Sequence, residues 1–159
     1  MPPRSSLYCA AFLIFALSGV GLLWRGPANR VGTAAYVVAE YRKEAATLQL
    51  PPGSRWPAKL PFTGIGPDGV KESYGKGMGT NYADDYWFCS WAKRALDRRL
   101  PAAARHEALA QLPSFRNTYE WKHFMPPDTR ASENAMIEKA LRGNTAELRA
   151  NCSWFGGKQ

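Results

Sequence analysis

A few side chains of this chain have the residue types and the spacing that catalysis or metal binding would require. The first of them is a carboxylate. Asp85 falls on the apolar side of an expected helix, near Cys89 and Ala92. A carboxylate held against an apolar surface has a raised pKa and can serve as an acid. At such a position it more often caps its helix or pairs with an arginine. We therefore expect no catalytic residue here.

The two histidines give little support to a metal site. Glu120 and His123 share one helical face, as in di-iron helix bundles, but those bundles need two such motifs and further glutamates. His106 and Glu107 do not complete an HExxH motif, and no CxxC pair is present. We expect neither a metal nor a cofactor.

A glycine-rich string at residues 64–69 matches the dinucleotide-binding pattern GxGxxG only in its letters. No strand pattern precedes it, no helix pattern opens on it, and Pro67 lies inside it. Because that motif binds phosphate at the N-terminus of a helix, we expect no dinucleotide site.

Cys89 and Cys152 are the two cysteines outside an apolar N-terminal segment. An even number of cysteines in an exported domain favours a disulfide. Closing a loop of about 64 residues would stabilise the fold by roughly 4 kcal/mol in the chain-entropy model. The alternative is two buried thiols that pack as small hydrophobes.

The elements that hold these residues are expected to be helices. Apolar residues at helical spacing predict an amphipathic helix over 32–48 and a stronger one over 81–99, which Thr80 or Asn81 would cap. One face of the second helix gathers its apolar side chains and should form the centre of the core: Phe88, Cys89, Trp91, Ala92, Ala95 and Leu96.

Further helices are expected from Pro101 to Leu112, over 114–124, and from about Asp128 to Gly143, with Ile137 and Leu141 inward. A last short helix leads to residue 152. Between the first two helices, residues 50–79 hold five prolines and seven glycines, which predicts a long irregular loop. No strand pattern is present, so the fold class is mainly α.

Aromatic side chains beside this loop form the one candidate binding surface: Tyr74, Tyr82, Tyr86 and Trp87. On a helical wheel Tyr86 and Trp87 project away from the core face. Exposed aromatic rings can stack on sugar rings or bind a partner peptide. The alternative is that residues 50–79 fold over the helix and bury these rings.

Residues 7–24 (LYCAAFLIFALSGVGLLW) form an uncharged apolar run. As a helix it would span about 27 Å, against a hydrocarbon core of about 30 Å. After a short tail at 1–6, this run predicts a transmembrane anchor or uncleaved signal, followed by a small helical domain at 25–159. A signal peptide cleaved near Ala16-Leu17-Ser18 and a non-membrane helix are the alternatives.

The placement of the domain rests on two opposing arguments. Arg25 and Arg30 after the run lean toward a cytoplasmic domain by the positive-inside rule. The cysteine pair and the similarity of the run to an export signal favour the outside. We expect a single-pass protein of the cell membrane with its C-terminal domain outside.

The net charge is +8, and the basic residues are scattered rather than clustered. The densest group holds acidic residues as well: Lys93, Arg94, Asp97, Arg98, Arg99, Arg105 and Glu107. A nucleic-acid partner is therefore not expected. The expected partners are the lipid bilayer and an envelope protein or an anionic envelope polymer.

The segments LPPGSRWP (50–57) and YGKGMGTNYADDYWFCSW (74–91) resemble small, uncharacterised single-pass membrane proteins of high-GC Gram-positive bacteria. That resemblance implies an envelope location and no particular activity.

The sequence thus predicts a membrane-anchored extracytoplasmic helical domain that acts by binding rather than as an enzyme. Two alternatives stay open. One is an envelope hydrolase that uses an acid in or near residues 64–86. The other is a basic domain on the cytoplasmic membrane surface.

Overall fold

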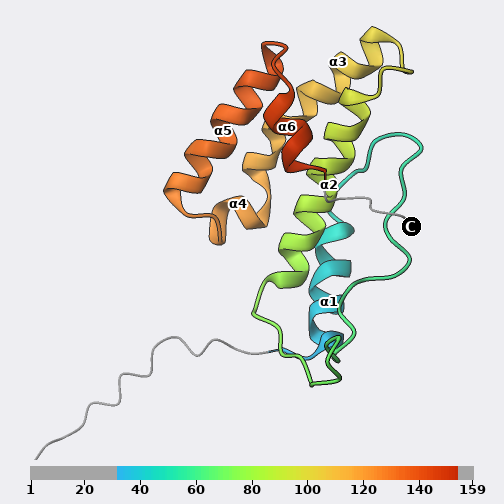
Figure 1. Ribbon diagram of the computed structural model, residues 1–159, viewed down its shortest axis with the longest axis vertical. Coiled ribbons are helices and arrows are strands. Elements are labelled where there is room, and N and C mark those ends of the chain that lie inside the picture. The colour runs from blue at the N-terminus through green and yellow to red at the C-terminus, as the bar shows by residue number, and fades with distance from the viewer. Residues whose placement is uncertain (1–31, 154–159) are drawn as a thin grey trace, which may run out of the picture.

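The computed structural model describes residues 32–153 and is built of helices (Figure 1). The helices are α1 (Ala34–Ala45), α2 (Met78–Leu96), α3 (Ala102–Gln111), the 3-10 helix η1 (Leu112–Asn117), α4 (Tyr119–His123), α5 (Pro127–Leu141) and α6 (Ala146–Asn151). Over these residues the only β-structure is two isolated bridges, which confirms the mainly α fold class.

The expected anchor at 7–24 and the tail at 1–6 lie outside the described residues. Between residues 32 and 153, no helix combines the length and the apolar character that crossing a bilayer requires.

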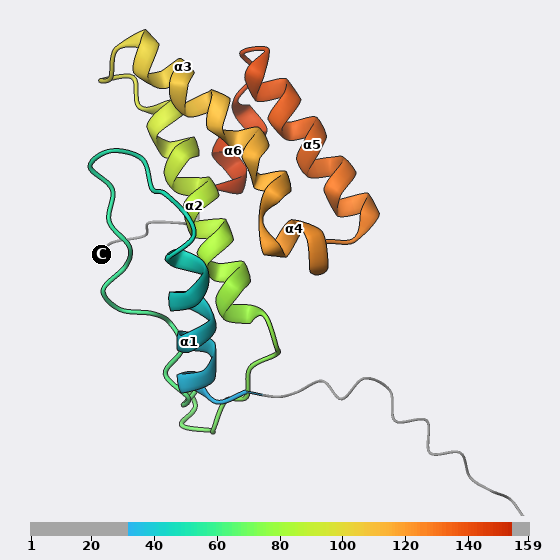
Figure 2. The same cartoon turned by 180° about the vertical axis from the view of Figure 1, so that it is seen from behind.

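Helices α1 and α2 lie side by side and start at the same end of the molecule (Figures 1 and 2). Because they run in the same direction, the chain must return along the whole of α1 before α2 can begin. Residues 46–77 make this return, which explains the long irregular segment. The two helices touch at Gly79, where a Cβ atom would collide with the backbone carbonyl of Val37.

Helix α2 begins earlier than the sequence predicts, so the expected cap at Thr80 or Asn81 is wrong. Gly77 precedes the helix in the left-handed conformation, with φ of 86°. Its amide donates to both carboxylate oxygens of Glu40 on α1, each at 3.0 Å. A negative charge there stabilises the positive end of the helix dipole. The cap comes from another helix, which local sequence patterns do not reveal.

Helix α2 is the centre of the molecule, with α1 and the loop on one side and α3 to α6 on the other (Figure 2). The predicted core face is confirmed, since Phe88, Cys89, Trp91, Ala92 and Ala95 are all buried. From the other side, side chains of η1, α5 and α6 complete this core: Leu112, Phe115, Ile137, Ala140 and Leu148. Leu141 was predicted inward but is exposed, because α5 ends at this residue and Gly143 turns the chain away.

The helix expected over 114–124 is two shorter pieces. The chain turns at Thr118, whose backbone is extended and whose hydroxyl accepts from the amide of Trp121 at 3.3 Å. This cap starts α4 in a new direction and brings Glu120 against α2. The break therefore positions one of the carboxylates described below.

Candidate functional site

The Cys89–Cys152 disulfide joins α2 to the C-terminal end of α6. The two Cα atoms are 5.3 Å apart, although the cysteines are 63 residues apart in sequence. Both cysteines are buried, and the bond holds the six-residue α6 against the central helix. The predicted pairing is confirmed.

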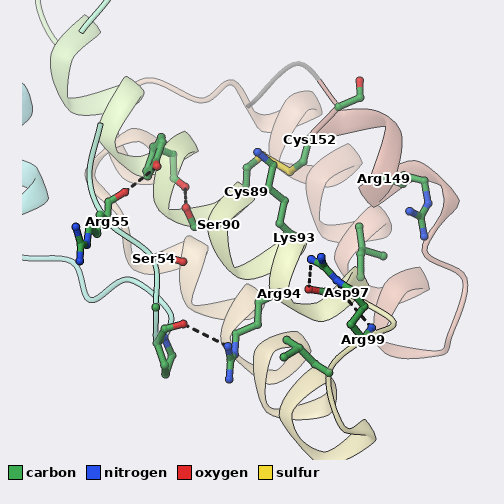
Figure 3. A pocket seen from close by; sticks show the side chains of 16 residues that line it. Ser54, Arg55, Cys89, Ser90, Lys93, Arg94, Asp97, Arg99, Arg149 and Cys152 are labelled. Atoms are coloured by element: carbon green, nitrogen blue, oxygen red, sulfur yellow. Dashed lines mark hydrogen bonds and ion pairs between the residues drawn. A yellow bond between two sulfur atoms is a disulfide. The ribbon is translucent and has the colours of Figure 1, made fainter. Parts of the chain in front are cut away.

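A groove of about 1050 Å³ opens beside this disulfide (Figure 3). One wall is the loop at 52–55, the floor is the C-terminal half of α2, and the other wall is α6 with Ser153. Cys89 and Cys152 themselves line it. The disulfide thus fixes the distance between the floor and one wall.

The groove is strongly basic. Among residues 32–153, five cationic side chains and one carboxylate, that of Asp97, line it; the cations are Arg55, Lys93, Arg94, Arg99 and Arg149. They come from three separate segments, and Figure 3 shows Arg55 on the loop side, Arg149 on the α6 side, and Lys93 and Arg94 between them. Three distant parts of the chain therefore supply one positive surface.

Only one of these cations is neutralised. Arg99 donates to both oxygens of Asp97, each at 2.8 Å. These hydrogen bonds lower the pKa of Asp97 to about 2, so this pair stays ionised. Among residues 32–153, no carboxylate lies within ion-pair distance of Arg55, Lys93, Arg94 or Arg149. The groove consequently keeps most of its positive charge for an anion.

Two hydrogen bonds hold the loop wall in place. Arg94 donates to the carbonyl of Pro52 at 3.3 Å, and the hydroxyl of Tyr86 donates to the carbonyl of Arg55 at 2.8 Å. Both bonds run from α2 to the loop. A groove whose walls are already set loses less conformational entropy when a ligand binds.

The four aromatic residues predicted as an exposed binding surface are largely covered by residues 46–77. Trp87 is buried and donates from its indole nitrogen to the carbonyl of Gln49 at 2.9 Å, so the prediction that it projects outward is wrong. Tyr74 is also buried, and the rings of Tyr82 and Phe62 meet edge to face with centroids 5.4 Å apart. Only Tyr86 borders the groove.

A second unusual feature is a group of carboxylates between α2, α4 and α5. Asp84 is fully buried, and its carboxylate accepts from the amide of Glu120 at 2.8 Å, which caps α4. Burial raises the pKa of Asp84 to about 7, although the hydrogen bond from Glu120 opposes this shift. This acid is therefore protonated more readily in the folded protein than in the unfolded chain.

Asp85, Glu120 and Glu133 line a cavity of about 170 Å³ beside Asp84's helix. Burial, then the charge of Glu133, raises the pKa of Asp85. Burial, then the charge of Asp85, raises the pKa of Glu120, and burial raises that of Glu133. The side chains of Asp85 and Glu120 are in hydrogen-bond contact, an arrangement in which two carboxyl groups share one proton. Asp85 therefore faces other acids and not the arginine that sequence patterns favoured.

The other sequence motifs acquire structural roles. His123 stacks on Tyr119 with ring centroids 4.2 Å apart, so it does not join Glu120 in a shared site. In the part of the chain between residues 32 and 153, no group of three or more potential ligands is placed to hold a metal ion. The glycine string forms a tight turn, in which Gly66 and Gly69 close hydrogen bonds across residues 64–72.

Sequence reasoning noted Lys93, Arg94 and Arg99 but missed Arg55 and Arg149 as their partners. A signal for Arg149 was present. Lys93 follows Cys89 by one helical turn and Arg149 precedes Cys152 by about one turn, so a bridge between the cysteines also brings these cations together. The sequence contains no comparable signal for Arg55, because the return loop brings this residue to the groove.

Comparisons with known proteins return nothing for this chain: no family model, no curated protein and no solved structure matches it.

Proposed function

We propose that this protein is a membrane-anchored, extracytoplasmic helical domain that binds an anionic polymer of the cell envelope in its basic groove. The observation that carries the proposal is the set of four groove cations that form no ion pair with a carboxylate of residues 32–153: Arg55, Lys93, Arg94 and Arg149. Uncompensated positive charge on the floor and both walls of an open groove suits a ligand with repeated negative charges.

Two features support the location. The uncharged run at 7–24 has the length and composition of a single membrane span. The Cys89–Cys152 pair suits an oxidising compartment, where disulfides form and persist. Together they favour a domain on the outer side of the membrane.

Fractionation with external protease tests this location. Spheroplasts would be treated with protease, and in a separate undigested sample Cys89 and Cys152 would be probed with an alkylating reagent at lysis. We expect a carbonate-resistant membrane protein whose domain is digested from outside and whose cysteines resist alkylation. A protected domain with reactive thiols would instead favour the basic domain on the cytoplasmic surface.

Binding to long-chain polyphosphate, with neutral dextran as the comparison, tests the groove. The double variant Lys93→Glu/Arg149→Glu should bind polyphosphate at least about tenfold more weakly, since each reversal replaces an attraction by a repulsion. Affinity of the wild type should also fall steeply with added salt.

The matched control is Lys43→Glu/Arg142→Glu. It changes the net charge equally, but both residues are exposed and lie outside the groove. We expect the affinity of this control for polyphosphate to stay within about twofold of the wild-type affinity, because salt screens charges that lie far from the ligand. Equal weakening by both double variants would assign binding to overall charge and overturn the groove proposal.

A second candidate, an envelope hydrolase, is favoured by one specific observation. Asp85 and Glu120 are in hydrogen-bond contact at a cavity and both have a raised pKa. A carboxyl group that is protonated near neutral pH can donate a proton to a leaving group. The binding proposal is preferred because this cavity, at about 170 Å³, is much smaller than the groove.

Replacing Asp85 by Asn separates the two candidates. If Asp85 has a structural role, the substitution should change the melting temperature. The wild type should then cleave no chromogenic ester or glycoside. A catalytic role predicts a cleaved substrate whose turnover is lost in Asp85→Asn while the melting temperature is kept.

A further inference from the structure

Two exposed aliphatic side chains lie at the tip of the turn formed by residues 64–72. Ile65 is 54% exposed and Val70 is 62% exposed, the largest exposures among the bulky hydrophobic residues of the described chain. Ile65 forms a β-bridge with Lys71, and Gly66 accepts from Gly69 and donates to Val70, so the tip is an ordered turn. An ordered turn that holds two such side chains outward presents a small apolar surface.

Hydrogen bonds fix this turn to the beginning of the described chain. Gly32 and Tyr74 exchange backbone hydrogen bonds of 2.7 and 3.2 Å. The hydroxyl of Tyr74 accepts from the amide of Gly64 at 2.9 Å and donates to Glu72 at 2.6 Å. The tip therefore cannot move far from residue 32.

The position of residue 32 indicates what lies next to the tip of the turn. The expected anchor ends at residue 24, so only residues 25–31 separate the bilayer from Gly32. Seven extended residues reach at most about 25 Å. Both ribbon views show the start of α1 and the loop before α2 at the same end of the molecule, opposite the end of α5 (Figures 1 and 2). This end must face the membrane if the anchor is in place.

The charges around the tip balance. Lys71 and Lys76 are exposed, while Asp68 accepts from the amide of Val70 at 3.0 Å and Glu72 holds Tyr74. Residues 64–76 hold these two lysines and two acids, so this part of the chain carries no net charge. Attraction to a lipid surface would therefore come from the aliphatic side chains rather than from anionic headgroups.

We propose that the turn at residues 64–72 docks on the outer surface of the bilayer, with Ile65 and Val70 in the boundary between headgroups and acyl chains. This inference rests on the proposed anchor. Two aliphatic side chains bind a membrane weakly on their own, but a short tether raises the effective concentration of the lipid surface enough to keep the contact formed. Docking at this end directs the C-terminal end of α2, which lies about 28 Å from its start, and with it the basic groove, away from the bilayer.

The test uses full-length protein in vesicles of phosphatidylethanolamine and phosphatidylglycerol. A nitroxide is attached at Val70→Cys in a Cys9→Ser background, and its collisions with oxygen and with a water-soluble nickel chelate are measured. We expect high oxygen and low nickel accessibility, which is the signature of the headgroup and acyl boundary. Added salt should leave these values unchanged, because the contact is apolar.

The matched control is Leu141→Cys in the same background. Leu141 is an exposed aliphatic residue at the end of α5, on the opposite end of the molecule, and its label should report bulk water. If the label at residue 70 reports bulk water while carbonate extraction leaves the protein in the membrane, the anchor stands and the docking proposal fails. If carbonate extracts the protein, the proposed anchor itself fails.

Discussion

The two halves of α2 carry opposite charges in opposite environments. The N-terminal half holds Asp84 and Asp85 between neighbouring helices, where burial raises the pKa of both. The C-terminal half presents Lys93 and Arg94 along an open groove. The cations lie in the last turn of α2, where the helix dipole favours them, but no acid lies in its first turn. The dipole therefore does not explain why one set is buried and the other exposed.

The neighbours of each half explain the difference. The N-terminal half packs against α1 and α4 and faces α5 across a small cavity, so its carboxylates lose contact with water. The C-terminal half is covered on one side by the core and left open between the loop at 52–55 and α6. Buried charges respond to pH and affect stability, whereas exposed charges remain available for a ligand. Four predictions test this division.

The largest effect is expected from the disulfide, which holds α6 against the basic half of α2. Replacing both Cys89 and Cys152 by Ala should lower the free energy of unfolding by about 4 kcal/mol, because the unfolded chain regains a long loop. Urea titration with and without reductant measures it. Reductant should destabilise the wild type and leave the double variant unchanged; a wild type that is insensitive to reductant would contradict the structure.

A slightly smaller effect is expected from the contact between α1 and the acidic half. Gly79→Ala should lower the free energy of unfolding by about 3 kcal/mol, since the new methyl group meets the carbonyl of Val37. Gly75→Ala is the control, because no atom lies within 4 Å of the added Cβ. In urea titrations the control should stay within about 0.5 kcal/mol of the wild type. Similar losses in both variants would show that the helices do not touch at Gly79.

The acidic half should make stability fall as the pH rises. The folded pKa of Asp84 is about 7, above its ordinary value of 3.8, so its stabilising contribution is complete below 3.8 and is lost as the pH rises toward 7. We expect a loss of about 2 kcal/mol between about pH 5 and about pH 8 in urea titrations.

Asp84→Asn should flatten this profile, because the amide oxygen still accepts from Glu120 and cannot ionise. Asp128→Asn, at an exposed position in the first turn of α5, should leave the slope as it is. An unchanged slope in Asp84→Asn would show that this carboxyl group does not titrate with folding.

The smallest effect is expected from the groove. Lys93→Glu/Arg149→Glu should change the free energy of unfolding by less than about 0.5 kcal/mol, because both side chains are exposed and form no ion pair within the described residues. Thermal and urea unfolding would measure it. A large loss would mean that these cations support the fold, and their effect on ligand binding could then not be assigned to the groove.

The sequence predicts the local features of this molecule well. Helical spacing of apolar residues located α1, the core face of α2 and the irregular return segment, since each depends on neighbouring residues alone. The disulfide followed from counting cysteines. The start of α2 was missed because its cap is Glu40, which lies on another helix.

Features built from distant segments were predicted least well. A helical wheel placed Trp87 outward, but the return segment covers it with the carbonyl of Gln49. The partners of Asp85 come from α4 and α5, and the groove needs Arg55 and Arg149 from opposite ends of the domain. Neither site is a motif in sequence, because each exists only after the helices have packed.

The most direct test of the division within α2 is a titration of isotope-labelled protein with polyphosphate, followed residue by residue by NMR. The account predicts shift changes confined to residues 52–55, 86–100 and 149–153, with residues 78–85 unaffected. Changes centred on residues 78–85, or spread evenly over the exposed lysines and arginines, would contradict it.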